Sequence, residues 1–170
     1  MADLKEFKEN PQKQLLEQIK EARCVMLGSP NPSEHMQPMS PQLDDDIIEN
    51  YPGNIYFYSD NTSDLGKAVL ADNGPVMLTY MTKDYQACVR GRLYPITNMQ
   101  LIERFWNPIV ASWYPGGKTD PKMMMLRFEM EDAALWASTD STLKFLYETT
   151  KANITDTLPD IGDRTHIKSA

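Results

Sequence analysis

The stretch Ile55-Tyr56-Phe57-Tyr58-Ser59 predicts the clearest strand of the sequence. Its residues are aromatic or β-branched with one exception, and such residues are enriched in strands. Further along the chain, Val76–Thr82 and Gln86–Tyr94 are two more expected strands, with a turn near Lys83-Asp84 between them. A tight turn of this kind joins strands that run antiparallel. The centre of the sequence therefore predicts an antiparallel sheet.

Outward from this centre, expected strands outnumber crossover helices. The sequence before the centre predicts a helix from Pro11 to about Ala22, a strand at Arg23–Gly28, a turn at Ser29–Ser33 and a returning strand at His35–Leu43. The other expected elements are a short helix after Ser63, a helix after Asn98, a long strand at Met123–Trp136 and a helix through Leu143 and Thr150. This pattern favours a mainly β, α+β fold, an antiparallel barrel with flanking helices. We expect a single domain over residues 1–170, with peripheral tails at 1–9 and 154–170, and the polar tail after Asn153 is expected to be loosely held.

Composition and charge argue against several classes of protein. Of the 170 residues, 41% are hydrophobic and 24% are charged, so the chain can bury a core and is not expected to be disordered. A net charge of −7 argues against a nucleic-acid partner, which needs clustered Lys and Arg. No stretch approaches the roughly 20 apolar residues of a membrane span, and no signal peptide is visible, so we expect no membrane association and a cytoplasmic location. Cys24 and Cys88 lie in apolar runs and are expected to be buried free thiols.

Familiar catalytic and metal-binding motifs are absent from the sequence. It contains no Gly-rich phosphate loop, HExxH, Cys/His cluster or GxSxG, so we assign no metal and no catalytic acid or base. His35 is expected to lie at the surface. Asp44-Asp45-Asp46 is expected to be a solvated loop, because consecutive side chains diverge on any regular element. Met123-Met124-Met125 is expected to fill the core.

Four segments are candidates for a ligand site, and the first combines polar groups with a helix start. It runs from Tyr58-Ser59-Asp60 into a helix that carries Ser63 and Lys67. Backbone N–H groups at the start of a helix attract anions, so Ser63 and Lys67 are candidates for a phosphate site. The alternative is that Ser63 only caps the helix.

The other three segments offer ring contacts and further polar groups. Trp113-Tyr114-Pro115, which follows Trp106-Asn107-Pro108, suits either a wall for a planar ring or a plug of the core. Gln86, on an expected strand, either donates to a ligand carbonyl or is solvated. Met36-Gln37-Pro38-Met39 is an irregular strand that would expose backbone groups to a ligand.

In order and spacing, these segments resemble the general stress protein branch of the pyridoxamine 5'-phosphate oxidase-like family of FMN-binding split barrels. The likeness runs from the first helix to about Asp163. Its most specific part is Phe105-Trp106-Asn107-Pro108 followed by Trp113-Tyr114-Pro115-Gly116-Gly117-Lys118, which is similar to the family's WNP…W(F/Y)PGGK run. The resemblance implies an antiparallel split β-barrel.

The resemblance also implies roles for single residues. Ser63 and Lys67 would hold the flavin phosphate. Gln86, which stands five residues before Gly91, would face the flavin ring. Trp136 would approach the site from the same dimer. The cofactor-binding residues that it implies are Gln37, Pro38, Met39, Tyr58, Ser59, Asp60, Ser63, Lys67, Gln86, Trp113, Tyr114, Pro115 and Trp136. One position departs from the family, whose members carry Arg where this chain has Gln37 before Pro38-Met39. The change removes a positively charged, bidentate donor.

From the resemblance we expect a homodimer that holds a flavin, FMN first and FAD second, in a cleft shared by the two subunits. The expected activity is that of an oxidoreductase in a stress response, with a nicotinamide or another small molecule as electron donor. Two other functions stay open: a flavin-binding stress or sensor protein without turnover, and a structural dimer that has lost the cofactor, which the departure at Gln37 keeps open.

Overall fold

The computed structural model of the chain describes residues 2–29, 35–71, 74–138, 142–155 and 157–168. Its helices are α1 (Leu4–Glu9), α2 (Pro11–Lys20), α3 (Asp45–Asn50), α4 (Asp64–Leu70), α5 (Met99–Phe105), α6 (Pro108–Ala111) and α7 (Thr142–Thr155), with a short 3-10 helix at Gly117–Thr119. Its strands are β1 (Val25–Gly28), β2 (Gln37–Met39), β3 (Asn54–Asp60), β4 (Val76–Met81), β5 (Tyr85–Ile96), β6 (Met123–Ser138) and β7 (Gly162–Lys168).

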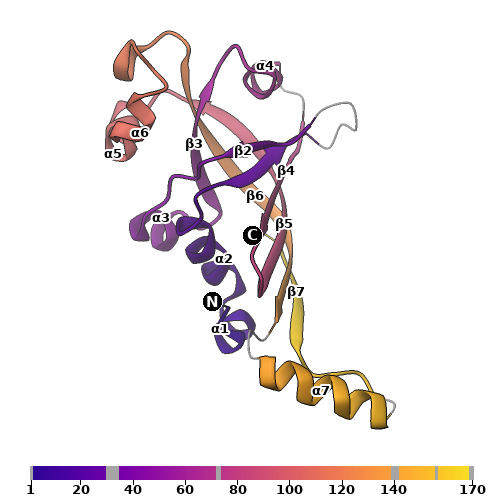
Figure 1. Cartoon of the computed structure of the whole chain (residues 1–170). Coiled ribbons are helices and arrows are strands. Elements are labelled where there is room, and N and C mark those ends of the chain that lie inside the picture. The colour runs from indigo at the N-terminus through magenta and orange to yellow at the C-terminus, as the bar shows by residue number, and fades with distance from the viewer. Residues whose placement is uncertain (1, 30–34, 72–73, 139–141, 156, 169–170) are drawn as a thin grey trace.

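The strands form one antiparallel sheet that curls into a half-barrel. Its order is β2-β1-β4-β5-β6-β3, and β7 pairs with β6 beside this path. Helices α1 and α2 lie along one side of the sheet, α4, α5 and α6 gather at one end, and α7 extends from the other end (Figure 1). The predicted mainly β fold, an antiparallel split barrel with flanking helices, is confirmed.

Alternation along the strands directs one face of the sheet toward the core. On β5 the side chains of Tyr85, Ala87 and Val89 are buried, while those between them are at least partly exposed. Phe7 of α1 packs its ring edge-on against Tyr85, with the ring centroids 6.0 Å apart. The core also includes Leu15, so both N-terminal helices close this face of the sheet.

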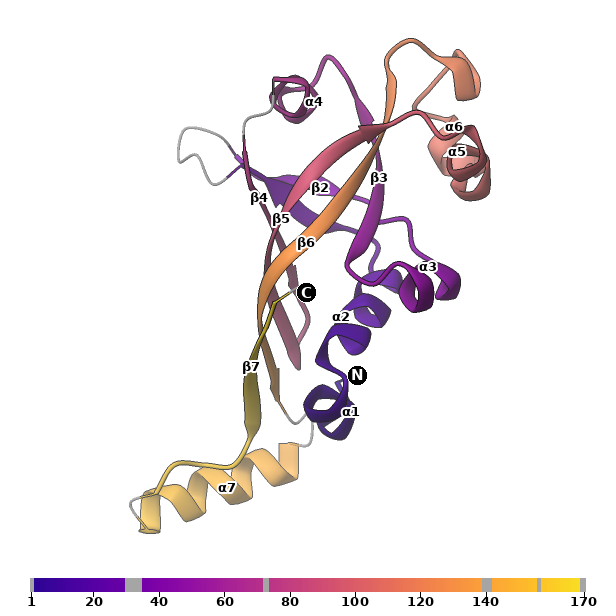
Figure 2. The ribbon, with the colours of Figure 1, turned by 180° about the vertical axis from the view of Figure 1, so that it is seen from behind.

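Strand β6 is the longest strand and runs from one end of the molecule to the other (Figure 2). Its pairing with β5 shifts register between Arg90 and Gly91, which marks a β-bulge. A Cβ atom at Gly91 would collide with the carbonyl oxygen of Glu129 and with the ring of Phe128. Glycine is required there because the two backbones approach too closely for a side chain.

The two predicted peripheral tails are more firmly held than expected. Phe7 is 1% exposed within the core, so the expectation for residues 1–9 is wrong over α1. At the other end, β7 pairs with β6 from Gly162 to Lys168, and Lys8 forms an ion pair of 3.2 Å with Asp163. The expected loose attachment of 154–170 is therefore wrong over β7, because backbone hydrogen bonds to β6 hold a strand that is mostly polar.

Two further expectations are corrected by the structure. Cys24 is exposed and Cys88 is only partly buried, because each lies outside the core-facing alternation of its segment. Asp44-Asp45-Asp46 begins helix α3 and is not a loop: Asp44 accepts a hydrogen bond from the Ile47 N–H at 3.0 Å and so caps the helix. The guanidinium of Arg104 also contacts Asp44 at 2.6 Å and Asp46 at 2.9 Å, which ties α5 to α3.

None of the helices in the described ranges has the length and apolar character that a membrane span requires.

Candidate binding cavity

A cavity of about 440 Å³ lies between β2, the end of β3 and helix α6. This volume falls in the range of about 300–1,000 Å³ that is usual for small-molecule sites. Its lining combines apolar side chains, neutral hydrogen-bonding groups and one carboxylate. The lining residues are Gln37, Pro38, Met39, Ser40, Gln42, Tyr58, Ser59, Asp60, Ser63, Asn107, Ile109, Val110, Trp113 and Tyr114.

The wall from β3 is fixed by contacts of Tyr58. Its hydroxyl group donates to the carbonyl oxygen of Ile102 in α5 at 2.6 Å, and its ring meets Trp106 edge-on, with the centroids 5.9 Å apart. Trp106 in turn lies 6.3 Å from the ring of Tyr114. These three rings form a packed wall between the sheet and the segment that follows α5.

Helix α6 supplies the opposite wall, and the sequence explains why it forms there. Asn107 caps the helix: its side-chain oxygen accepts hydrogen bonds from the N–H groups of Ile109 at 2.9 Å and Val110 at 3.1 Å, and Pro108 occupies the first helical position. The helix is followed by Trp113, which is 77% exposed, and Tyr114, which is 8% exposed. One aromatic ring therefore lies at the rim of the cavity and the next one inside it.

The cavity carries a single negative charge among its described lining residues and no lysine or arginine. The Asp60 carboxylate accepts hydrogen bonds from the Thr62 hydroxyl at 2.6 Å and the Thr62 N–H at 2.7 Å, which, together with nearby Lys122 and Lys67, hold its pKa below the ordinary value. Burial raises the pKa of Tyr58 to about 12 and that of Tyr114 to about 12. Near neutral pH both phenols are therefore protonated and only Asp60 is charged.

Nine of the thirteen residues expected at a cofactor site line this one cavity. They are Gln37, Pro38, Met39, Tyr58, Ser59, Asp60, Ser63, Trp113 and Tyr114. The segments come from β2, from β3 and the turn after it, and from the loop after α6, so the fold brings together residues that are far apart in the sequence.

Ser63 lines the cavity, but its hydroxyl group already has two partners. It accepts a hydrogen bond from the Gly66 N–H at 3.0 Å and donates to the Asp60 carbonyl oxygen at 2.7 Å. This is the helix cap that was the alternative for this segment. Lys67 is exposed and is not among the lining residues.

Gln86, Pro115 and Trp136 also lie outside the cavity lining. Gln86 and Trp136 are cross-strand neighbours on β5 and β6, and the Gln86 amide donates to the Thr82 carbonyl oxygen at 3.0 Å. Near the cavity, Ser59 of β3 pairs with Met124 of β6. At about 3.3 Å per residue, the strand from Met124 to Trp136 is roughly 40 Å long. Within one chain, Trp136 and the cavity therefore lie at opposite ends of β6.

Five lining residues were not predicted: Ser40, Gln42, Asn107, Ile109 and Val110. Asn107 lies in the tryptophan-asparagine-proline motif, whose capping chemistry was a usable signal for the helix that brings Ile109 and Val110 to the wall. Gln42 is placed by an isolated bridge to Tyr56, a long-range contact that no local pattern indicates.

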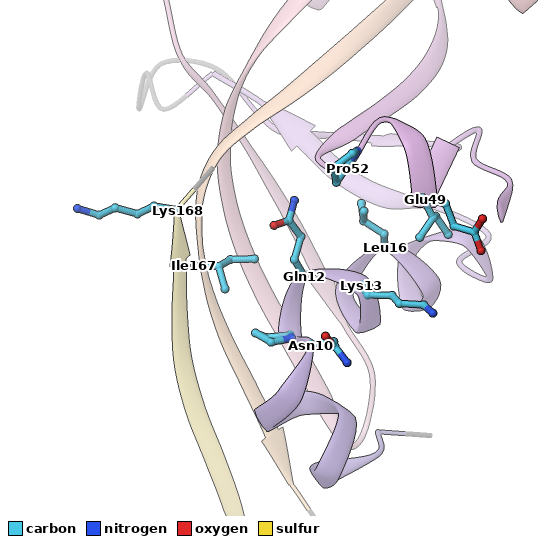
Figure 3. A pocket seen from close by; sticks show the side chains of 10 residues that line it. Asn10, Gln12, Lys13, Leu16, Glu49, Pro52, Ile167 and Lys168 are labelled. Carbon is cyan, nitrogen blue, oxygen red and sulfur yellow. The ribbon is translucent and has the colours of Figure 1, made fainter. Parts of the chain in front are cut away.

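A second cavity, of about 470 Å³, lies between α2, the region after α3 and the end of β7. Figure 3 shows that its two lysines, Lys13 and Lys168, point away from one another and away from the space between α2 and β7. None of the residues expected at a cofactor site lines this second cavity, so the cavity beside β3 is the better candidate site. In the described part of the chain, no group of three or more His, Cys, Asp or Glu side chains is placed to hold a metal ion.

Comparisons with known proteins agree with the fold. Residues 10–160 match the family described as pyridoxamine 5'-phosphate oxidase like. A structure named general stress protein 26 from Jannaschia sp. CCS1 is 28% identical and superposes with a TM-score of 0.76, covering 95% of this chain and 99% of that chain. The general stress FMN/FAD binding protein from Xanthomonas citri is 32% identical, with a TM-score of 0.67 and coverage of 78% and 92%. A general stress family protein from Xanthomonas campestris pv. campestris is also 32% identical, with a TM-score of 0.65 and coverage of 83% and 93%. No curated protein matches the chain.

Proposed function

Because this chain belongs to the pyridoxamine 5'-phosphate oxidase-like family, we propose that it binds a flavin, FMN first and FAD second, in the cavity beside β3. The observation that carries this proposal is the convergence of nine expected site residues on one cavity of suitable size. The Xanthomonas citri relative, whose name states FMN/FAD binding, supports it. We take residues 1–170 as one functional unit and the cytoplasm as its location.

The lining residues fit a flavin ring. Such a ring is planar, with apolar and polar edges, and the cavity offers the rings of Trp113 and Tyr114 beside the amides of Gln37 and Gln42. The Gln42 side-chain amide lies 3.3 Å from the carbonyl oxygen of Ser40 and 3.4 Å from its hydroxyl oxygen. Because both contacts are long, the amide can turn to a ligand. Bound flavin supplies the electron transfer chemistry, and the chain positions the ring and shields it from water.

The lining residues provide less for a phosphate group. The two lysines whose charges act on Asp60 are Lys67 and Lys122, and neither lines the cavity. We propose that Lys67 reaches the phosphate from the rim, since an exposed lysine side chain is long and flexible. Protonated Tyr58 and Tyr114 serve as ring contacts and not as bases, and the Tyr58 hydroxyl group keeps its hydrogen bond to the Ile102 carbonyl oxygen. We assign no catalytic acid or base.

We also propose a homodimer with a shared cleft. Gln86 and Trp136 lie at the opposite end of β6 from the cavity in their own chain. A two-fold axis that runs perpendicular to β6 and passes beside its middle would exchange the two ends, so a second copy would bring its Gln86 and Trp136 toward this cavity. Isologous pairs of this kind are the commonest assemblies.

Electrons would enter from a nicotinamide or another small-molecule donor, and a stress-related oxidoreductase is the activity that we propose. One observation favours a second candidate function, a structural dimer without cofactor. Gln37 occupies the expected arginine position, and the cavity holds the Asp60 carboxylate with no lining cation to offset it.

The test begins with the purified protein. We expect it to carry a flavin that mass spectrometry identifies as FMN, and added FMN to raise its melting temperature. A colourless protein that neither FMN nor FAD stabilises would support the structural dimer. Stopped-flow reduction by a panel of nicotinamide and dithiol donors then separates an enzyme, which cycles repeatedly, from a sensor that binds flavin without turnover.

A further inference from the structure

The guanidinium group of Arg104, near the end of α5, joins two carboxylates at the start of α3. Its Nε donates to Asp44 Oδ2 at 2.6 Å, and its Nη2 donates to Asp46 Oδ2 at 2.9 Å. One guanidinium group can contact both carboxylates because its N–H donors form a rigid planar fork. These three residues are here called the Arg104 brace. Arg104 does not line the cavity beside β3, but the chain on each side of the brace leads into a wall of that cavity.

On the α3 side, the brace holds the segment that carries Ser40 and Gln42, two residues of the cavity lining. Asp44 stands two residues after Gln42, and its Oδ1 accepts the capping hydrogen bond of α3 from the Ile47 N–H at 3.0 Å. The Gln42 N–H donates to the Tyr56 carbonyl oxygen at 2.7 Å, and the Tyr56 N–H donates to the Gln42 carbonyl oxygen at 3.3 Å. This isolated bridge to β3 is one anchor of the segment, and Asp44 is the other.

On the α5 side, the brace holds helix α6, which is the opposite wall of the cavity. Only Trp106 and Asn107 stand between Phe105, where α5 ends, and the start of α6. The Asn107 side chain spans this link, because its amide donates to the Phe105 carbonyl oxygen at 3.2 Å while its oxygen accepts from the N–H groups of Ile109 and Val110. A shift of α5 therefore moves α6 and its lining residues.

We propose that Arg104 is a positioning residue for the flavin site: by joining α5 to α3, it fixes the distance between the Gln42 wall and the α6 wall of the cavity. The Tyr58 hydroxyl group ties α5 to β3 inside the cavity, and Arg104 ties α5 to α3 outside it. Walls that are held in place before binding favour a planar ring, because little free energy is then lost in ordering them. This inference rests on the proposed function and adds a residue outside the cavity lining that sets the affinity of the site.

Riboflavin affinity tests the positioning role. Riboflavin is neutral, so the charge of Arg104 cannot by itself change its binding. Arg104→Gln removes the brace. The matched control, Lys20→Gln, removes a cation from Asp45, the carboxylate between the two of the brace, which Lys20 contacts at 2.8 Å from α2. By calorimetry we expect riboflavin affinity to fall at least about ten-fold in Arg104→Gln and to stay within about two-fold of wild type in the control.

A conservative variant and the control separate positioning from general stability. Arg104→Lys keeps the charge without the planar fork, so it should restore only part of the affinity. Wild-type affinity in Arg104→Gln would overturn the proposal. An equal loss in Lys20→Gln would also overturn it, because the effect would then come from the stability of α3 as a whole.

Amide hydrogen exchange tests the brace without a flavin. We expect the Gln42 N–H to exchange at least about ten-fold faster in Arg104→Gln than in wild type, and at the wild-type rate in Lys20→Gln. Unchanged exchange in Arg104→Gln would show that the bridge to Tyr56 alone holds the segment, and would overturn the role of Arg104. A wild-type protein that binds neither riboflavin nor FMN would contradict the proposed function, and hydrogen exchange distinguishes that failure from a failure of the brace.

Discussion

The hydroxyl group of Tyr58 donates a hydrogen bond of 2.6 Å to the carbonyl oxygen of Ile102 and so joins β3 to α5 beside the cavity. The bond ends at a helical carbonyl and lies next to the Tyr58–Trp106 ring contact. One side chain therefore fixes the distance between the sheet and the segment that supplies the other cavity wall.

Replacing Tyr58 with Phe removes this hydrogen bond and keeps the ring contact. We expect the free energy of unfolding to fall by about 0.5–1.5 kcal/mol, the usual net value of such a bond. Urea titration measures the loss. Tyr80→Phe is the control, because the Tyr80 hydroxyl lies 3.5 Å from Gln18 Oε1 and contributes little. Equal losses in the two variants would mean that the Ile102 bond has no special role.

Lys67→Ala tests the proposed phosphate contact. We expect FMN affinity to fall by about ten-fold to a hundred-fold, because a hydrogen bond to a charged group is lost, and riboflavin affinity to stay nearly constant. Calorimetry with both ligands measures this. Lys13→Ala, which removes a lysine from α2, is the control. A similar loss for riboflavin would place the damage in the ring pocket, and no loss for either ligand would remove Lys67 from the site.

Asp60→Asn tests the charge in the cavity. The amide oxygen can still accept the hydrogen bonds from Thr62, while the negative charge disappears. We expect FMN to bind about two-fold to five-fold more tightly, because repulsion between the carboxylate and the phosphate is removed. Riboflavin, which has no phosphate, serves as the internal control. Weaker FMN binding would show that Asp60 contacts the ligand directly.

Asp84 predicts a loss of stability in acid. Burial by itself would raise its pKa, but hydrogen bonds from the Ala2 N–H at 2.7 Å and the Thr82 hydroxyl at 3.0 Å hold the pKa below the ordinary value. A depressed carboxyl pKa stabilises the fold above the unfolded pKa of about 3.9, and this contribution is lost as the pH falls further. Urea titrations of wild type and Asp84→Asn should therefore differ most at pH 6 and converge toward pH 3. A constant difference would assign the effect to packing.

Gly91→Ala should destabilise the protein strongly, because its Cβ atom would collide with Glu129 and Phe128 across the bulge. We expect a loss of about 1–3 kcal/mol in the free energy of unfolding. Gly117→Ala provides a contrast, since a Cβ atom there meets open space and only its positive φ of 69° is unfavourable. A loss at Gly91 no larger than at Gly117 would show that the β5–β6 crossing can open to accept a side chain.

The sequence predicts those elements whose signals are local. The aromatic strand β3 and the pair β4 and β5, joined by a tight turn, follow from composition and alternation. Strand β7 could not be predicted in this way, because Gly162–Lys168 is mostly polar and only the long-range register with β6 makes it a strand. Helix α3 was missed for another reason: the Asp44 carboxylate was interpreted as solvated, whereas it caps the helix and contacts Arg104.

The same division applies to the candidate site. Residue patterns indicated the wall around Trp113 and Tyr114 and singled out the segments of β2 and the end of β3, and the resemblance assigned them to one cofactor site. The resemblance did not show that the Ser63 hydroxyl group caps helix α4. It also did not show that Gln86 and Trp136 lie at the end of β6 that is remote from the cavity. The Ser63 cap is a local contact that the sequence offered as an alternative, whereas the place of Gln86 and Trp136 depends on the register of β5 with β6.

The pairing of β5 with β6 also shapes how the chain folds. Ile96 pairs with Met125 at the end of the ladder next to the connection that contains α5 and α6. Tyr85 pairs with Ala137 at the other end of the same ladder. Closing the shorter loop costs less chain entropy, so the ladder should form first near Ile96 and extend toward Tyr85. The wall that α6 contributes to the cavity lies within that first loop. We therefore expect the α6 wall of the cavity to form before the end of the ladder at Tyr85 and Ala137.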